Sequence, residues 1–138
     1  MIILDTNVLS ELMLRAPEKR VLMWLDQQPR SSIWTTSVTV FEIRFGLESM
    51  PVSKRQAALM EDLEKMLASI DRRVAAFDIE AAERASTLMA SRKLRGRPRE
   101  DRDTMIAGIV LARHAALATR NVGHFDDLSA PVVNPWTA

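Results

Sequence analysis

The chain begins with Met1-Ile2-Ile3-Leu4-Asp5-Thr6-Asn7-Val8-Leu9, in which an apolar run ends abruptly at a carboxylate. This pattern predicts a short buried strand over residues 1–4 and a helix over residues 7–14. In open parallel sheets the first strand is commonly central, and ligands bind beyond the carboxyl ends of the strands, at the switch point. Asp5 therefore stands where a site is expected, although it can also serve simply as the N-cap of the following helix.

Strand-like apolar runs and helical patterns alternate along the rest of the chain. The pattern predicts strands over residues 32–36, 74–77, 117–119 and 132–133, and helices over residues 17–27, 38–47, 53–70, 79–93 and 103–114. Short strands that alternate with helices imply βαβ units, so we predict an α/β fold with a parallel sheet covered by helices on both faces. Nothing divides the chain, and residues 1–138 are predicted to form one domain.

The composition excludes several classes of protein. With 138 residues, 47% of them apolar, the chain can build a core without covalent crosslinks. The absence of cysteine excludes a disulfide framework and a thiolate zinc site, and two histidines are too few for a histidine-rich metal centre. We see neither a secretory signal nor an apolar run of the roughly 18 residues that span a membrane, so a soluble, cytoplasmic protein is expected.

Glu42 interrupts a second apolar run, on the helical stripe that carries Val38 and Phe45. A surface glutamate normally avoids such a stripe. Two simpler explanations remain open, namely an ion pair with Arg44 or Arg20, or a position at the edge of the stripe. Glu42 alone is therefore a weak indication of a site.

Asp103 lies at the start of the apolar helix predicted over residues 103–114. The helix dipole favours an acidic residue there, which is a structural explanation. Asp101 is expected to be the N-cap, which leaves Asp103 free to point elsewhere. If the fold gathers Asp5, Glu42 and Asp103, their charges repel one another and favour a bound cation. Oxygen ligands favour Mg²⁺ or Mn²⁺ over zinc.

A second polar cluster, Thr119-Arg120-Asn121, follows the strand predicted over residues 117–119 and should reach the same edge of the sheet. Asn121 would bring a fourth oxygen ligand or would position a water molecule. Asp78 also follows a strand, but it is explained by ordinary helix capping. The two histidines, His114 and His124, are expected at the surface or in a supporting role, and neither is predicted to be a catalytic base.

A basic run lies between residues 92 and 102, although the net charge of the chain is only +1. The run contains Arg92, Lys93, Arg95, Arg97, Arg99 and Arg102. It is either a solvated helix end and loop or a patch that contacts phosphate groups. Because the run leads directly into Asp103, we favour phosphate contacts, with Arg95, Arg97 and Arg99 as the candidates.

Taken together, these motifs resemble the PIN-domain family, in particular the VapC-type toxins of bacterial toxin–antitoxin pairs. The resemblance is carried by residues 3–11 (ILDTNVLSE), 36–46 (TSVTVFEIRFG), 103–107 (DTMIA), 118–121 (ATRN) and 133–136 (VNPW). Each motif is loose, but their order and spacing are specific. The family's fourth acidic position matches Asn121 here, which makes a second metal ion less certain than the first.

The resemblance implies a three-layer α/β/α fold and a metal-dependent endoribonuclease. Its cofactor would be Mg²⁺, with Mn²⁺ as a substitute, held by Asp5 and Asp103. Glu42 would orient or deprotonate the attacking water or support the metal. The implied partners are an RNA substrate, an antitoxin that inserts a cation among the carboxylates, and a second copy of the chain in a homodimer. An antitoxin helix is expected in a groove between the early helices, near Leu9, Leu12, Met13 and Leu22.

Two other functions remain open from the sequence. An aspartyl-phosphate phosphotransferase of the haloacid-dehalogenase type also starts with an apolar strand and an aspartate. It needs a second aspartate two residues later, where this chain has Asn7, and a late lysine that is not evident. A non-catalytic RNA-binding or partner-binding protein on the same fold is the other possibility, with Asn121 marking a lost site.

Overall fold

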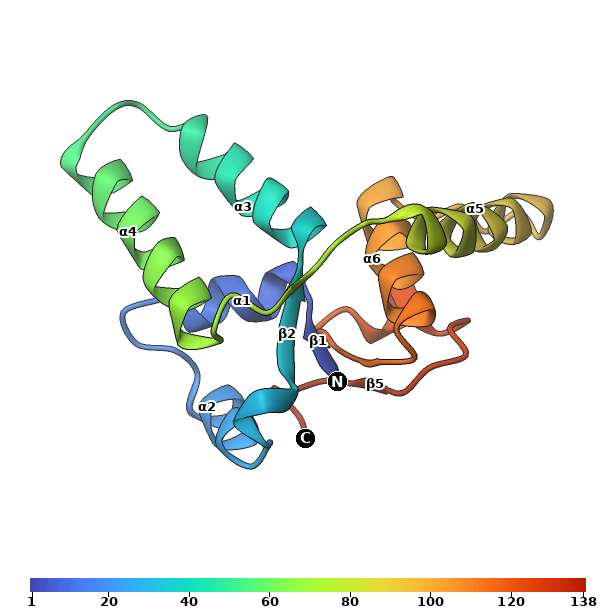
Figure 1. Ribbon diagram of the computed structural model, residues 1–138, viewed down its shortest axis with the longest axis horizontal. Coiled ribbons are helices and arrows are strands. Elements are labelled where there is room, and N and C mark those ends of the chain that lie inside the picture. Colours follow the sequence, from blue (N-terminus) through green and yellow to red (C-terminus); the bar gives the residue numbers. More distant parts are fainter.

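Five short parallel strands lie in the order β3-β2-β1-β4-β5 in the computed structural model, which describes all 138 residues (Figure 1). The strands are β1 (Ile2–Leu4), β2 (Ile33–Thr36), β3 (Val74–Ala75), β4 (Ala116–Ala118) and β5 (Val132–Val133). Ile3 pairs with Trp34 of β2 and with Leu117 of β4, so the first strand occupies the centre. The predicted parallel sheet is confirmed. The strand order reverses at β1, which places the switch point beside Asp5.

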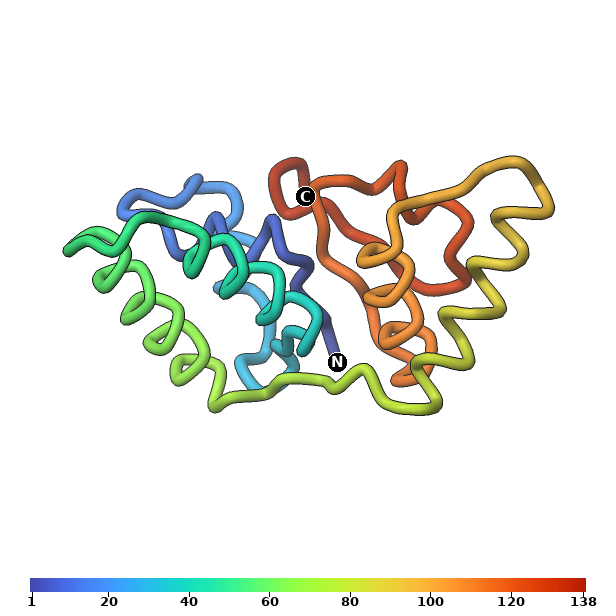
Figure 2. The backbone as a smooth tube through the Cα atoms, turned by 90° about the horizontal axis from the view of Figure 1, so that it is seen from above, coloured from blue at the N-terminus to red at the C-terminus, as the bar shows by residue number.

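Six helices connect these strands. They are α1 (Thr6–Leu12), α2 (Lys19–Asp26), α3 (Ser37–Glu48), α4 (Lys54–Ser69), α5 (Ile79–Leu94) and α6 (Asp101–Ala112), with 3₁₀ turns η1 (Arg30–Ser32) and η2 (Val122–Phe125). Every predicted boundary lies within two residues of the observed one. None of the helices is long and apolar enough to cross a membrane. Figure 2 shows the chain passing from α4 through β3 to α5, which links the two groups of helices.

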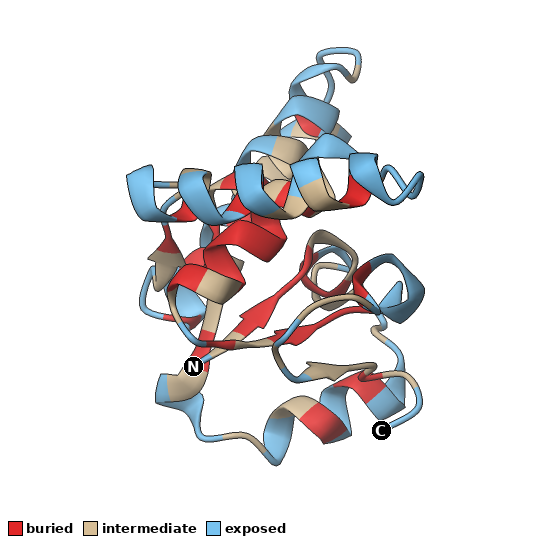
Figure 3. Ribbon diagram, turned by 90° about the vertical axis from the view of Figure 1, so that its right-hand side faces the viewer, coloured by how far each residue is buried: buried red, intermediate tan, exposed pale blue.

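The three layers follow from the alternation of side chains along the strands. Ile3 packs on one face of the sheet with α5 and α6, whereas Leu4 packs on the other with α1, α2 and α4. Both side chains are fully buried, and each such burial stabilises the fold by about 1.5–3 kcal/mol. Figure 3 shows the buried residues along the strands and on the helix faces that meet them.

Gly108 allows α5 and α6 to approach closely. A Cβ atom at this position would lie 2.4 Å from the carbonyl oxygen of Ala81 and 2.7 Å from the Cβ of Ala85. Any side chain here would force the two helices apart. This contact fixes the helix that carries Asp103 against its neighbour.

The helix caps confirm one prediction and correct another. The carboxylate of Asp78 accepts a hydrogen bond from the Ala81 amide at 3.0 Å, as its capping role requires. Asp101 is not the N-cap of α6. The helix begins at Asp101, Glu100 precedes it, and no side chain caps it. Asp101 and Asp103 therefore both lie in the first turn, where the helix dipole favours negative charge.

Candidate active site

Asp5 lies at the carboxyl edge of the sheet, between the ends of the central strands β1 and β4. Its backbone amide continues the strand pairing by donating to the Ala118 carbonyl at 2.9 Å. Its side chain is only 3% exposed. The chain turns directly from the strand into α1 here, so a carboxylate is held at the switch point with little contact to water.

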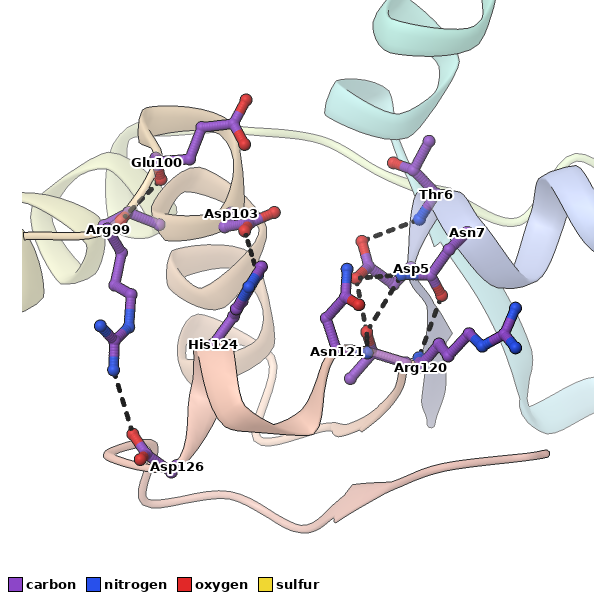
Figure 4. A network of polar contacts seen from close by, with 12 residues as sticks. Asp5, Thr6, Asn7, Arg99, Glu100, Asp103, Arg120, Asn121, His124 and Asp126 are labelled. Carbon is purple, nitrogen blue, oxygen red and sulfur yellow. Dashed lines mark hydrogen bonds and ion pairs between the residues drawn. The ribbon is translucent and has the colours of Figure 1, made fainter. Parts of the chain in front are cut away.

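Three neighbours hold the Asp5 carboxylate in place. Oδ1 accepts a hydrogen bond from the Thr6 amide at 2.8 Å, and Oδ2 accepts one from the Thr119 hydroxyl at 2.7 Å (Figure 4). The Asn7 amide group lies 3.4 Å from the same Oδ2. Asp5 is thus also the N-cap of α1, so the structural explanation and the site explanation both hold. Burial raises the pKa of Asp5 above its ordinary value, against these hydrogen bonds.

Glu42 faces Asp5 from α3 across the Thr6 side chain. The Thr6 hydroxyl donates to Glu42 Oε1 at 3.2 Å, and Arg102 Nη1 lies 3.9 Å from Glu42 Oε2. The alternative explanation for Glu42, an ion pair with Arg44 or Arg20, does not hold. Arg44 instead pairs one turn along its own helix with Glu48, and Arg20 donates to the Trp136 carbonyl. Burial raises the pKa of Glu42, and the nearby Arg102 partly opposes this.

Asp103 points toward η2 from the first turn of α6, where its Oδ2 lies 3.0 Å from Nδ1 of His124 (Figure 4). The negative charge of Asp103 contributes to the raised pKa of Asp5 and of Glu42. The three carboxylates therefore act on one another through a shared electrostatic field. His124 is exposed and supports Asp103, in agreement with the supporting role expected for it.

The loop after β4 reaches the same edge, as predicted for residues 119–121. The backbone amide of Asn121 donates to the Thr119 hydroxyl at 3.0 Å, and the backbone amide of Arg120 donates to Asn7 Oδ1 at 3.1 Å. In Figure 4 the Asn121 side chain extends from the start of η2 toward Asp5. The structure therefore brings Asn121 to the same edge of the sheet as Asp5.

The basic run is not one uniform surface patch. Arg92 is 1% exposed and bound inside the protein, so it cannot contact a ligand from solvent. Arg95 and Arg99 are partly neutralised by Asp127 and Asp126, at 3.3 and 3.6 Å. Arg97 is exposed and forms no ion pair, which makes it the freest cation among the three candidates.

The donor set of this site suits a hard divalent cation, because it consists of carboxylate, hydroxyl and amide oxygens. No group of three or more acidic or histidine side chains is close enough to enclose an ion in the present arrangement. Asp103 is turned toward His124, and Glu42 toward Thr6 and Arg102. The side chains of His124 and Arg102 are 52% and 42% exposed, so both can swing away into solvent.

The sequence did not predict two neighbours of these carboxylates, Arg102 and His124. It assigned neither Arg102 to Glu42 nor His124 to Asp103. Phe41 and Phe45 are exposed and lie under Arg102, whose guanidinium carbon is 5.8 and 6.0 Å from the two ring centroids. The position of Arg102, directly before Asp103, was the only signal for it in the sequence.

Comparisons with known proteins agree with this fold. The PIN-domain family model matches residues 2–130, and the chain belongs to the PIN-domain family. It is 41% identical over 139 aligned residues to the plasmid stability protein StbB of Pseudomonas syringae pv. tomato, covering all of both chains. It is 37% identical to the VapC ribonuclease Y4jK of Sinorhizobium fredii, over 99% of this chain and 98% of the other. The crystal structure of FitAcB from Neisseria gonorrhoeae superposes with a TM-score of 0.90 over all of both chains at 32% identity.

Proposed function

We propose that this protein is a metal-dependent endoribonuclease and the toxin of a toxin–antitoxin pair. The observation that carries the proposal is the position of Asp5, a nearly fully buried carboxylate at the switch point. The negative charges of Glu42 and Asp103 repel the negative charge of Asp5. Such an arrangement is costly unless a cation neutralises it. The similarity to the VapC ribonuclease Y4jK over almost the whole chain supports RNA as the substrate.

The three acidic residues take two roles in this proposal. Asp5 and Asp103 would hold Mg²⁺, or Mn²⁺ in its place. When bound, the cation supplies the Lewis acid that polarises a phosphodiester and lowers the pKa of a water molecule. Glu42, with its raised pKa, would take the proton from the attacking water. The expected products carry a 3′-hydroxyl and a 5′-phosphate.

The residues around the carboxylates fix their directions. Thr6 links Asp5 to Glu42, since its amide donates to one and its hydroxyl to the other. Asn7 joins α1 to the loop after β4 through Thr119 and the Arg120 amide. Asn121, which is neutral, would position water or phosphate rather than add a fourth charge.

The RNA backbone would pass over the loop between α5 and α6. Arg97 is the main candidate contact, because its charge is not neutralised by a neighbour. Arg95 and Arg99 would contribute less while they remain paired with Asp127 and Asp126. Release of either pair on RNA binding would restore the full charge of the run.

An antitoxin has a suitable groove beside the carboxylates. A groove of about 370 Å³ runs from Glu42 and Arg102 along apolar side chains at the end of α1 and on α3 and α4, among them Met13, Ile43, Leu47 and Leu59. Of the four residues expected beside an antitoxin helix, Met13 lines this groove, whereas Leu9 is fully buried and Leu22 lies outside it. An apolar antitoxin helix in this groove would bring an arginine or lysine to the acidic cluster.

A cleavage assay tests the catalytic part of the proposal. Purified protein is incubated with 5′-labelled single-stranded RNAs of defined sequence, with Mg²⁺ or with a chelator. We expect Mg²⁺-dependent labelled fragments that end in a 3′-hydroxyl, and their loss in Asp5→Asn. Cleavage that persists in the chelator, or at the same rate in Asp5→Asn, would overturn the proposed mechanism.

Co-expression tests the toxin part. The chain is produced alone and together with the small open reading frame that adjoins its gene, and growth and gel-filtration behaviour are measured. We expect growth arrest by the chain alone, and rescue together with a stable complex when the neighbour is present. Normal growth with the active chain alone would contradict the toxin assignment. The proposed homodimer is read from the same gel filtration.

A further inference from the structure

Arg92 is a charged side chain that the proposed mechanism does not use, yet it is buried to 99% beside the site. It lies in the last turn of α5, and its guanidinium is enclosed rather than turned to solvent, with 1% exposure. Burial of a cation is costly unless every donor finds an acceptor. The acceptors of this guanidinium therefore show which parts of the chain it holds together.

The guanidinium binds three separate parts of the chain. Nε and Nη2 donate to the two carboxylate oxygens of Asp127 at 2.9 and 2.8 Å, which is a two-pronged ion pair. Nη1 donates to the hydroxyl of Thr104 at 2.9 Å, and Nη2 also donates to the backbone carbonyl of His124 at 3.2 Å. Arg92 lowers the pKa of Asp127 below its ordinary value, as expected for a tight pair.

Two of these contacts, with Thr104 and with His124, involve residues adjacent to Asp103. Thr104 is the next residue of α6, and its hydroxyl also donates to the Glu100 carbonyl, which closes the first turn. His124 touches the Asp103 carboxylate through its ring while Arg92 holds its backbone. Arg92 thus contacts both the residue that follows Asp103 and the backbone of the residue whose ring contacts Asp103.

The end of α5 is itself shaped to hold Arg92 at this point. Gly96 has a φ of +69°, a left-handed conformation that glycine adopts without strain. The Gly96 amide donates to the Lys93 carbonyl at 3.0 Å, and the Arg97 amide donates to the Arg92 carbonyl at 2.8 Å. This pair of bonds ends the helix and turns the chain away. Arg92 faces inward, while Arg97 is left outside.

We infer that Arg92 is a positioning residue, which holds the first turn of α6 against the backbone of η2 and so sets where the Asp103 carboxylate lies in the acidic cluster. This inference rests on the proposed function for its catalytic consequence, although the geometric part stands by itself. Arg92 touches neither metal nor RNA. It acts through Thr104, His124 and Asp127.

The test uses Arg92→Lys, which keeps the positive charge and loses the two-pronged geometry. Its matched control is Arg73→Lys. Arg73 is another largely buried arginine, 16% exposed, which donates to the Ile33 and Arg30 carbonyls at the amino end of β2 and contacts none of the acidic cluster. Both variants are expected to lower the melting temperature, so lost stability alone cannot distinguish them.

Three measurements distinguish a role in positioning Asp103 from a general contribution to stability. In Arg92→Lys the amides of His124 and Thr104 should exchange with deuterated water at least tenfold faster than in Arg73→Lys. The affinity of the purified chain for Mn²⁺ should fall by about tenfold, the lower end of the range for residues that orient metal ligands. Cleavage should lose kcat by roughly ten- to hundredfold with an unchanged KM for RNA.

Thr104→Val provides a second variant if Arg92→Lys does not fold. It keeps the buried branched shape and removes only the hydroxyl that accepts from Arg92, so we expect the same changes at smaller size. Wild-type exchange at His124 and Thr104 in a folded Arg92→Lys or Thr104→Val protein would overturn the inference, as would the same Mn²⁺ affinity and kcat as in Arg73→Lys. If the wild type neither binds Mn²⁺ nor cuts RNA, the proposed function fails, and the exchange rates still decide the role of Arg92.

Discussion

His124 and Asp103 form a direct contact at the mouth of the acidic cluster, with 3.0 Å between Nδ1 and Oδ2. The Nδ1 atom of His124 thus engages an Asp103 oxygen that would otherwise be free to bind a cation. The His124 side chain is 52% exposed, so this contact is easily broken. It makes His124 a competitor for the proposed metal site as well as a support for Asp103.

Removal of the histidine ring should therefore tighten cation binding. In His124→Ala, the hydrogen bond to Asp103 no longer has to be broken, and we expect Mn²⁺ affinity to rise by about fivefold, or roughly 1 kcal/mol. Isothermal titration calorimetry of the purified chain measures this change. His114→Ala is the matched control, since His114 is exposed and lies beyond the C-terminal end of α6, whereas Asp103 lies in its first turn. Unchanged or weaker Mn²⁺ binding in His124→Ala would contradict the competition.

The raised pKa of Asp5 predicts how stability depends on pH. Because the folded state holds the Asp5 proton more tightly than the unfolded chain, the stability associated with that proton is present at low pH. It is lost as the pH rises from the ordinary pKa through the raised one. The amide side chain of the Asp5→Asn variant does not ionise, so the variant is spared this loss. Its free energy of unfolding relative to the wild type should therefore increase across that interval by about 1.4 kcal/mol for each unit of the pKa shift.

Urea unfolding at a series of pH values measures this difference. Asp127, whose pKa is lowered by Arg92, loses its stabilising charge as the pH falls, but it does so equally in both proteins. Glu48→Gln is the control, because the Glu48 carboxylate is 60% exposed in its pair with Arg44. Parallel pH curves for the wild type and Asp5→Asn would show that burial does not strain this carboxylate.

Two glycines in helices should respond to alanine in opposite directions. Gly108→Ala places a Cβ 2.4 Å from the Ala81 carbonyl oxygen and should cost about 1–3 kcal/mol through overpacking. Gly46→Ala in α3 meets no atom within 4 Å and should stabilise the fold by up to about 1 kcal/mol through helix propensity. Thermal unfolding of both variants gives the signs. A neutral or stabilising Gly108→Ala would mean that α5 and α6 are not packed as described.

The fold could be predicted because its signals are local. Alternating apolar runs and helical stripes give the strands and helices to within two residues, and the position of Asp5 directly after the first strand indicates the switch point. The partners of the site residues depend on packing between distant segments. Nothing local distinguishes the buried Arg92 from the exposed Arg97, because the difference lies in Asp127, far along the chain. Glu42 likewise has its cation on α6 rather than on its own helix.

The free guanidinium of Arg97 predicts a specific effect on RNA binding. Arg97→Ala should weaken binding to single-stranded RNA and reduce the slope of log K against log salt by about 0.7, the value for one lost phosphate contact. Arg95→Ala and Arg99→Ala should change the slope less, because their partners already neutralise them. Fluorescence anisotropy at several salt concentrations provides the slopes. Equal slopes for Arg97→Ala and the wild type would assign this loop to the solvated surface.

The central claim is that Asp5, Glu42 and Asp103 together form one cation site, and Mn²⁺ titration of single variants tests it most directly. Calorimetry is performed on the wild type and on Asp5→Asn, Glu42→Gln and Asp103→Asn, with Asp78→Asn as a carboxylate control outside the site. We expect the wild type to bind Mn²⁺, each of the three variants to lose at least about tenfold in affinity, and the control to match the wild type. A wild type that does not bind Mn²⁺, or Asp5→Asn and Asp103→Asn proteins that bind it as tightly as the wild type, would contradict the account.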